Sequence, residues 1–304
     1  MSSLYCQEQP EQNPVETIFN EIKQEIAAAG PLSVLVAPKN PTQWDLHTFL
    51  QSLKADEFKP KINQLALEQK NRLMQKIFKI PDDVAPWQAQ RDFLALIIEE
   101  GGDINANSSR ETFLGKGALY NDLPAVTFAL NHKADTRIKS GSDYPLELTK
   151  DLRIAQLLVA HGGLEPIKNS PFHTYKLLST CMQPQCSYQL LKLYKDQGLN
   201  FNLKDTFQWT LLHALCAWAP NTKPFEFFEK FLILYQASAI NVQERNNKDE
   251  TALDSIKQIK NQNNVTVKLA RALLEGLENN PGVWKSKLLS RKRTFQEFQE
   301  GQEY

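Results

Sequence analysis

Hydrophobic residues recur every three or four positions along most of the chain, and this spacing predicts a series of amphipathic helices. The first predicted helix covers residues 15–29, where Val15, Ile18 and Ile22 share one face and Gly30 ends the pattern. Strict alternation of apolar and polar residues, which indicates strands, is rare by comparison. The pattern therefore predicts an all-α fold.

The amino-terminal part of the chain predicts a small helical unit. Polar residues 1–14 predict a flexible amino terminus, and further helices are expected at 42–53 and, as one long element, at 60–79. Between the first two helices, residues 31–36 alternate and predict a short extended segment. Residues 15–85 thus form a helical unit of their own, and the sequence leaves its role open.

A second pattern begins near residue 86 and repeats to about residue 279. It consists of an apolar helix followed by Gly-x-Asp-x-Asn, and its clearest copy runs from Leu94 to Asn105. Degraded copies cover 126–135, 155–164, 190–202 and 228–241. A glycine or small residue after a helix favours a left-handed C-cap, and Asn or Asp favours the turn that follows.

Short helix openings alternate with these tails. The clearest opening is Thr210-Leu211-Leu212-His213-Ala214, and the others begin at Thr112, Tyr144, Ser170 and Thr251. Successive openings are 32, 26, 40 and 41 residues apart. Because Thr and Ser are preferred N-caps, most of these positions predict the first turn of a helix.

The alternation of openings and tails resembles the ankyrin repeat, a unit of roughly 33 residues that opens with Thr-Pro-Leu-His-x-Ala. The resemblance implies a solenoid of about five to six degenerate repeats over 86–279, preceded by the helical extension and followed by a helical tail at 280–304. It also implies that Thr210 caps its helix and that the Thr210 hydroxyl and the His213 ring form hydrogen bonds within and between neighbouring turns.

The chain departs from the ankyrin pattern at several positions. The third unit leaves room for only a turn or two of first helix at 146–151, and insertions at 183–185 and 220–224 predict surface loops. The glycine that normally precedes each Thr is replaced by Arg110, Gln208 and Asp249. We therefore expect the hairpins at these positions to differ in shape from the family pattern.

Ankyrin stacks bind proteins through a continuous concave surface, so the resemblance implies a non-enzymatic protein–protein interaction module. Aromatic and arginine side chains carry most of the energy in such interfaces. The family frame places Phe207 and Trp209 on one hairpin and Trp218 on the first-helix side; the alternative is that irregular loops fold over the two hairpin rings. The candidate partner-binding residues of the other repeats are Arg110, Phe113, Tyr120, Asp143, Lys168 and Lys248.

Composition is consistent with a soluble globular chain, at 41% hydrophobic and 23% charged residues. Lys+Arg and Asp+Glu each total 35, so the net charge gives no indication of a nucleic-acid partner. Four cysteines favour a reducing compartment, and neither a secretory signal nor a membrane-spanning run is apparent. We expect a cytoplasmic monomer with a protein partner and no membrane span.

The last residues carry a different charge pattern. The basic cluster at 285–293 either forms the polar face of a helix covering the end of the repeats or acts as a nuclear-import or anionic-surface patch. Glu297, Glu300 and Glu303 follow it. Their spacing resembles the carboxyl-terminal signals of bacterial effectors exported by type IV secretion, which implies export into a host cell and a host protein as partner.

Motifs for catalysis, metals or cofactors are nearly absent from the sequence. Cys216 follows His213 by three residues, as in a Cys–His nucleophile pair, but both fall at positions that ankyrin repeats bury, so we predict a core thiol and a core histidine. Cys181 and Cys186 have no second ligand pair nearby, so no metal and no cofactor are expected. Two alternatives to a binding module remain open: an effector enzyme with catalysis in 15–85 and the repeats as substrate-recognition surface, and an assembly protein whose tail docks on another copy.

Overall fold

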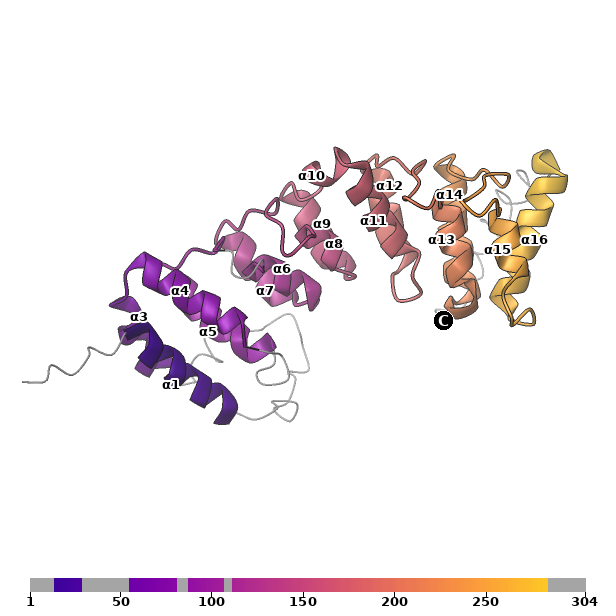
Figure 1. Cartoon of the computed structure of the whole chain (residues 1–304). Helices are drawn as coiled ribbons and strands as arrows, with labels where there is room; N and C mark the ends of the chain where they lie inside the picture. Colours follow the sequence, from indigo (N-terminus) through magenta and orange to yellow (C-terminus); the bar gives the residue numbers. More distant parts are fainter. Residues whose placement is uncertain (1–13, 29–54, 81–86, 107–110, 284–304) are drawn as a thin grey trace, which may run out of the picture. The chain divides into compact units, whose positions relative to one another are not determined.

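A computed structural model describes most of the chain (Figure 1). The described residues are 14–28, 55–80, 87–106 and 111–283. Among these residues the regular structure is helical, with isolated β-bridges but no β-strand, which confirms the predicted all-α class. None of the helices among these residues combines the length and the apolar character that crossing a membrane requires. The extended segment expected at 31–36, the helix expected at 42–53 and the tail at 284–304 lie outside the described residues.

The chain divides into two compact units, residues 1–148 and 149–304, which are described separately. In the first unit, four helices pack together around the buried face of the first of them. They are α1 (Pro14–Ala28), α3 (Ala55–Asn63), α4 (Leu67–Phe78) and α5 (Trp87–Glu99). The helix predicted at 15–29 is confirmed as α1, and Val15, Ile18 and Ile22 are buried as its spacing predicts.

The single long helix predicted at 60–79 is wrong, because the structure breaks it between α3 and α4. The Leu65 N–H donates to the Ile62 carbonyl at 3.0 Å, a tight turn that ends α3. The Gln69 side chain then accepts from the Ala66 N–H at 2.9 Å and begins α4. Leu65 itself is buried at this turn, so the apolar pattern continues through the break and hides it.

The first unit continues with α6 (Phe113–Leu119), α7 (Leu123–Asn131) and the one-turn helix α8 (Pro145–Leu148). Helix α6 packs against both α7 and α8. The predicted shortness of the first helix after Tyr144 is therefore confirmed.

A buried polar network joins α5 to the turn between α6 and α7. Arg91 Nη1 and Trp87 Nε1 donate to Asp122 Oδ2 at 2.7 and 3.0 Å, and Asp122 Oδ1 caps α7 by accepting from the Ala125 N–H. Arg91 Nε donates to Asp92 Oδ1 at 2.9 Å. Asp92 is fully buried, and its other oxygen has no hydrogen-bond partner among the described residues. Burial raises the pKa of Asp92 to about 7, although Arg91 acts to lower it.

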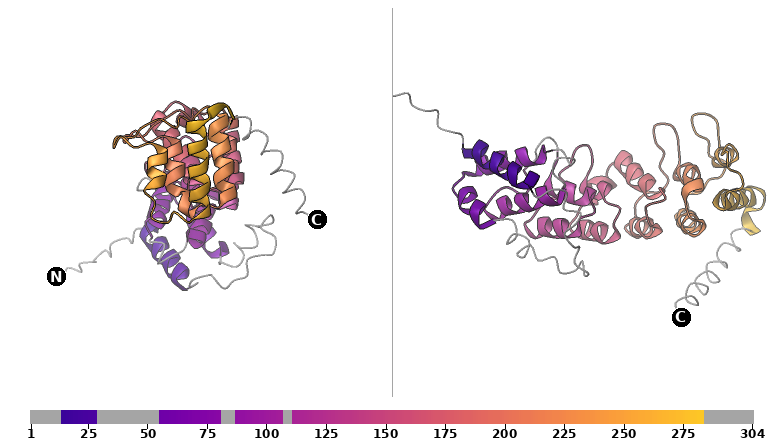
Figure 2. Two further views of the ribbon diagram at one scale, coloured as in Figure 1. Left: turned by 90° about the vertical axis from the view of Figure 1, so that its right-hand side faces the viewer. Right: turned by 90° about the horizontal axis from the view of Figure 1, so that it is seen from below.

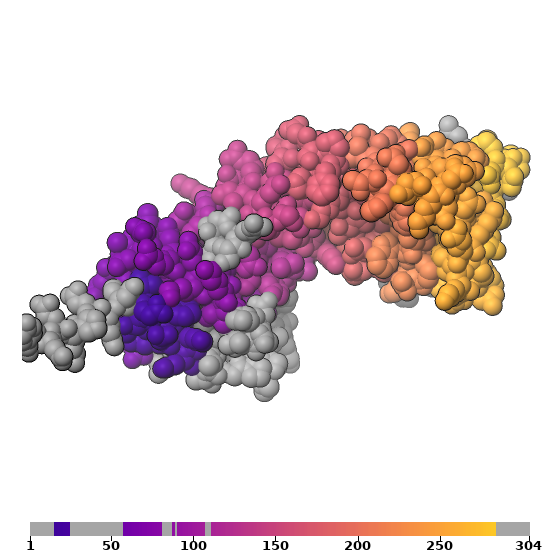
Figure 3. Space-filling model, in the orientation of Figure 1, coloured from indigo at the N-terminus to yellow at the C-terminus, as the bar shows by residue number. Residues whose placement is uncertain are grey.

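In the second unit the helices form two layers (Figures 1 and 2). Helices α11, α13 and α15 pack side by side in one layer, and α9, α12, α14 and α16 follow one another in the second. Their bounds are α9 (Leu152–Ala160), α10 (Glu165–Lys168), α11 (Pro171–Cys181), α12 (Tyr188–Asp196), α13 (Leu211–Trp218), η1 (Ala219–Asn221), α14 (Pro224–Gln236), α15 (Ala252–Lys257) and α16 (Val265–Asn279). In the space-filling view, the segments of this unit succeed one another in sequence order along the visible face (Figure 3).

The predicted openings coincide with helix N-caps in both units. A side-chain oxygen of the opening residue accepts the N–H three residues later at Thr112 (3.0 Å), Ser170 (3.4 Å), Thr210 (3.4 Å) and Thr251 (3.2 Å). Tyr144 has no such oxygen, and there the Glu147 carboxylate accepts the Tyr144 N–H at 2.8 Å. Each opening therefore fixes the start of the helix that follows it.

The predicted left-handed turns are confirmed after each of the five repeated helices. The residues with positive φ are Gly101 (91°), Lys133 (64°), Gly162 (82°), Gly198 (75°) and Ser238 (54°). In every copy the next N–H donates to the carbonyl five residues back, the bond of a Schellman cap. Two of the five positions adopt this conformation without glycine, so the hydrogen-bond pattern persists where the residue type has changed.

The insertion at 183–185 forms a loop between α11 and α12, as predicted, and α14 holds it in place. Lys230 is fully buried in α14, and its Nζ donates to the Gln183 carbonyl at 2.8 Å. Glu226, one turn earlier, accepts the Tyr188 N–H at 3.0 Å. Burial lowers the pKa of Lys230, whose ammonium satisfies a carbonyl near the carboxyl end of α11.

A test of the buried network in the first unit is the substitution Asp92→Asn. Because the pKa of Asp92 is higher in the folded chain than its ordinary value of 3.8, the folded chain binds the proton more tightly. The stabilisation that comes from proton binding at Asp92 is therefore present at low pH and is lost as the pH rises from about 4 through about 7. We expect the variant to have a melting temperature that depends less on pH in this range and is higher than wild type at about pH 8.

Thermal unfolding followed by circular dichroism from about pH 5 to 8 measures this effect. Glu57→Gln, which neutralises an exposed carboxylate on α3, is the matched control and should keep the wild-type pH dependence. Identical pH profiles for wild type and Asp92→Asn would contradict the raised pKa.

Candidate functional site

The second unit carries two hairpins of the same shape, each leading into a first-layer helix. Hairpin A is residues 204–210 and precedes α13; hairpin B is residues 245–251 and precedes α15. An isolated antiparallel bridge closes each hairpin, between its first and last residues. Inside the bridge, the N–H of the second residue donates to the carbonyl of the sixth, at 3.1 Å in hairpin A and 3.0 Å in hairpin B.

An Asp or Asn side chain fixes the tip of each hairpin. In hairpin A, Asp205 Oδ1 accepts the N–H groups of Phe207 and Trp209, both at 2.8 Å. In hairpin B, Asn246 Oδ1 accepts those of Lys248 and Glu250, at 2.8 and 3.1 Å. These bonds replace water at the tip backbone, so both hairpins have a defined conformation.

Hairpins A and B have the same shape as each other, although neither has a glycine before its Thr. Gln208 and Asp249 adopt the left-handed conformation themselves, with φ of 61° and 63°. The side-chain acceptors Asp205 and Asn246 supply the hydrogen bonds that hold this turn. Arg110, the third position where the glycine is missing, lies outside the described residues.

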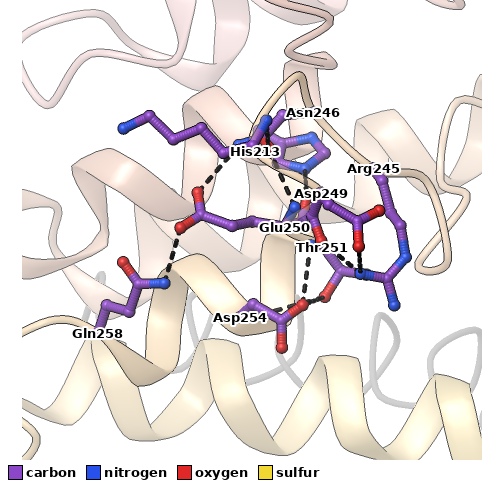
Figure 4. Close-up of polar contacts among 9 residues, drawn as sticks. His213, Arg245, Asn246, Asp249, Glu250, Thr251, Asp254 and Gln258 are labelled. Atoms are coloured by element: carbon purple, nitrogen blue, oxygen red, sulfur yellow. Dashed lines mark hydrogen bonds and ion pairs between the residues drawn. The ribbon is translucent and has the colours of Figure 1, made fainter.

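His213 connects the two hairpins (Figure 4). Its Nδ1 accepts from the Thr210 N–H at 3.3 Å and lies 2.8 Å from the Thr210 hydroxyl, so Nε2 carries the proton. Nε2 donates to the Glu250 carbonyl at 3.1 Å. These are the bonds within and between turns that the ankyrin resemblance implies. Burial lowers the pKa of His213, which favours this neutral ring.

Two further contacts hold hairpin A against hairpin B. The Asn247 N–H donates to the Phe207 carbonyl at 3.0 Å, and Lys204 forms an ion pair with Glu244 at the base of the hairpins. Together with His213, these bonds make the two hairpins one continuous surface of the second unit.

Aromatic side chains are exposed on this surface. Phe207 is 61% exposed at the tip of hairpin A, and Trp209 is half-buried, with its ring centroid 6.0 Å from that of His213. Lys248 occupies the position in hairpin B that Phe207 has in hairpin A, and it is exposed as well. The structure thus brings Phe207, Trp209 and Lys248 together, and no described loop covers the Phe207 ring.

Trp218 is not part of this hairpin surface. It is the last residue of α13, about 12 Å along the helix from Thr210 at 1.5 Å per residue, and it is 37% exposed. Trp218 is followed directly by η1, and the start of α16 lies at this end of α13, because Asn264 donates to the Pro220 carbonyl at 3.0 Å. The aromatic pair Phe207 and Trp209 therefore lies at the start of α13, and the third predicted aromatic residue, Trp218, lies at its end.

The candidates in the first unit have different surroundings, and the surface position expected for Phe113 is wrong. Phe113 is 1% exposed, because its ring packs between Trp87 and Phe128, with centroids 5.6 and 5.7 Å away. Tyr120 is partly exposed and stacks on the outer side of Trp87. Asp143 is half-buried, where its backbone pairs with Ser140 in a two-residue turn.

Lys168 is exposed, as a surface candidate requires, but it does not lie on a hairpin. Residues Glu165–Lys168 form the one-turn helix α10, because Pro166 favours the first turn of a helix and Ile167 is fully buried. Lys168 is exposed at the end of this turn, near Glu165. The repeat that contains α11 consequently lacks a hairpin like A or B.

Sequence reasoning missed two aromatic residues on α11. Phe172 is 65% exposed, whereas the residues at the same place in the other openings are buried. These equivalents are Leu114, Leu146, Leu212 and Leu253. Burial raises the pKa of Tyr175, one turn later, and the Asp205 carboxylate of hairpin A raises it further. Helix α11 also packs against α13, the helix that follows hairpin A. The only sequence signal was a phenylalanine at a position otherwise occupied by leucine.

The cysteines and the histidine that were considered for catalysis or metal binding are buried. Both ring nitrogens of His213 are engaged by Thr210 and Glu250, and Cys216 is fully buried with a pKa raised by burial. Cys181 and Cys186 are buried as free thiols with raised pKa values. Among the described residues, no group of three or more His, Cys, Asp or Glu side chains is arranged to hold a metal ion.

The substitution Gln208→Gly tests the conformation of hairpin A. Glycine adopts positive φ without steric cost, so we expect the variant to be more stable by about 1 kcal/mol. Gln197→Gly is the control, because Gln197 ends α12 with an ordinary φ of −79° and glycine there adds only chain entropy to the unfolded state. Urea unfolding measures both; a loss of stability in both variants would contradict the left-handed strain at Gln208.

The substitution His213→Gln tests the bridge between the hairpins. Because the pKa of His213 is lower in the folded chain than its ordinary value of 6.5, the unfolded chain binds more protons at acidic pH. The contribution of the neutral His213 ring to stability is present above about pH 6.5 and is lost as the pH falls below that value. We expect the variant to be about 1–2 kcal/mol less stable at neutral pH and less sensitive to acid than wild type.

Urea unfolding at about pH 7.5 and 5.5 provides the comparison. His161→Gln, at an exposed histidine that follows α9, is the control and should resemble wild type at both values. A variant that loses as much stability on acidification as wild type would show that His213 does not titrate as the bridge requires.

Comparisons with known proteins do not assign the chain to a family. Neither a scan against protein-family models nor a search of curated proteins finds a match. The function is therefore inferred from the repeated helix openings and from the surface formed by hairpins A and B.

Proposed function

We propose that residues 86–279 are a degenerate ankyrin-repeat array whose hairpin surface binds a protein partner without catalysis. The observation that carries this proposal is the exposed Phe207 ring on a hairpin whose backbone is fixed by Asp205 and Asn247. A large exposed ring is unfavourable in water and gains free energy when a partner covers it.

Two recurring features and one single contact support the ankyrin assignment. Ser or Thr caps the helix at four of five openings, a left-handed residue ends each of the five repeated helices, and His213 donates to the carbonyl that precedes the next opening. This contact is the role that the ankyrin resemblance implies for the signature histidine. The division into a helical extension at 15–85 and a repeat array at 86–279 remains part of the proposal.

The chemistry of the surface favours a protein partner. Phe207 and Trp209 provide aromatic area of the kind that dominates interface energies, and Lys248 and the Lys204–Glu244 pair surround it with both signs of charge. A polyanion such as nucleic acid requires an excess of positive charge, which this surface lacks. Export into a host and nuclear import depend on 285–304 and stay predictions from the sequence.

Affinity capture from a eukaryotic lysate with quantitative mass spectrometry tests the proposal. We expect at least one protein to be captured by wild type and lost with Phe207→Ala or Trp209→Ala, each weakening binding by about fivefold or more, or roughly 1 kcal/mol. Trp218→Ala, at the far end of α13, shows whether the surface extends along the helix.

Val265→Ala is the matched control, because Val265 is equally exposed in the same unit but lies at the opposite end from the hairpins. It should capture the same proteins as wild type. If folded Phe207→Ala and Trp209→Ala variants capture every protein that Val265→Ala captures, the hairpin surface is not the binding site.

A further inference from the structure

A continuous run of contacts leads from the end of α16 to Phe207. In the last turn of α16, Glu278 accepts from Gln243 Nε2 at 2.9 Å, and Gln243 lies two residues before the start of hairpin B. From hairpin B, the Asn247 N–H reaches the Phe207 carbonyl at 3.0 Å. Packed helices lie about 8–10 Å apart, so the exit of α16 is roughly two helix spacings from the Phe207 ring.

The surface along this path is acidic. We define the acidic strip as residues 241–251 and 275–279, which contain five acidic and two basic residues. Arg245 pairs with Asp249, and Glu244 pairs with Lys204 from hairpin A. The side chains that donate hydrogen bonds to Glu278 and Glu250 are neutral amides, which leave the negative charge of both carboxylates in place.

The segment that follows Val283 has complementary chemistry. Residues 284–293 contain five basic residues and no acidic one. Trp284, Leu288, Phe295 and Phe298 are spaced at 4, 7 and 3 residues, which places all four on one face of a helix. A helix over 284–298 would be about 22 Å long, which matches two helix spacings.

We propose that residues 284–298 dock across the acidic strip and cover Phe207 with Phe295 and Phe298. The basic side chains meet the carboxylates of the strip, and the apolar face removes the exposed ring from water. Docking does not depend on the proposed function. Its consequence does: a partner that binds Phe207 must first displace this segment, which makes the tail an intramolecular competitor.

Hydrogen–deuterium exchange of the full chain tests the docking directly. We expect the amides of hairpin A to exchange roughly tenfold more slowly in wild type than in Phe295→Ser/Phe298→Ser, as for a docked state populated about ten times more than the free one. Val265→Ser, at an exposed apolar residue at the other end of α16, should exchange like wild type.

Three results of this experiment would overturn the proposal. Equal exchange of hairpin A in wild type and the double variant would show that the tail does not cover it. Protection of α16 alone would place the tail at the end of the repeats. Protection that increases with protein concentration would show that the tail binds a second copy.

A cysteine pair provides an independent measurement. In the full chain, Phe207→Cys with Phe298→Cys should form an intramolecular disulfide under mild oxidation. Val265→Cys with Phe298→Cys is the control and should form none. Absence of the first crosslink, or an equal yield of both, contradicts docking.

The outcome of the docking experiments can be separated from that of the proposed function. If hairpin A is protected by the tail but no protein is captured even by Phe295→Ser/Phe298→Ser, docking stands and the binding function fails.

Discussion

The hairpin surface of the second unit depends on one neutral imidazole. His213 accepts a hydrogen bond from its own helix opening at Thr210 and donates one to the Glu250 carbonyl in hairpin B. Only one tautomer does both, and burial favours it by lowering the pKa of the ring. A protonated ring would direct a second N–H at the Thr210 N–H. The protonation state of His213 therefore contributes to the position of hairpin B relative to α13, together with the Asn247–Phe207 hydrogen bond and the Lys204–Glu244 ion pair.

This fixed geometry explains why an exposed phenylalanine is significant on hairpin A. A ring on a mobile loop loses conformational freedom when it is bound, which reduces the free energy of association. The backbone of Phe207 is already held on both sides, by Asp205 Oδ1 and by the Asn247 N–H. The exposed Phe207 ring is unfavourable in water, and little conformational entropy is lost when another surface covers it. Both effects favour burial of the ring by another surface.

The sequence predicted what is encoded within a few residues and missed what depends on distant packing. The cap at Thr210 and the left-handed turn at Gly198 follow from local hydrogen bonds, so their positions were predicted correctly. The burial of Phe113 depends on Trp87 and Phe128, which come from other helices, so a repeat frame could not reveal it. The exposure of Phe172 likewise reflects the absence of a covering side chain, which a local pattern does not record.

The repeat geometry persists at positions where the expected residue type is lost. Lys133, Gln208 and Asp249 adopt a left-handed conformation that costs a non-glycine residue about 1–2 kcal/mol, and no glycine is present to avoid this cost. At each position hydrogen bonds hold the turn, either through the Schellman bond to the preceding helix or through an Asp or Asn acceptor at the hairpin tip. The element that recurs along the described part of the chain is thus the hydrogen-bond pattern, which is kept where the residue type differs. Hairpins A and B therefore have the same shape, although neither has a glycine at its left-handed position.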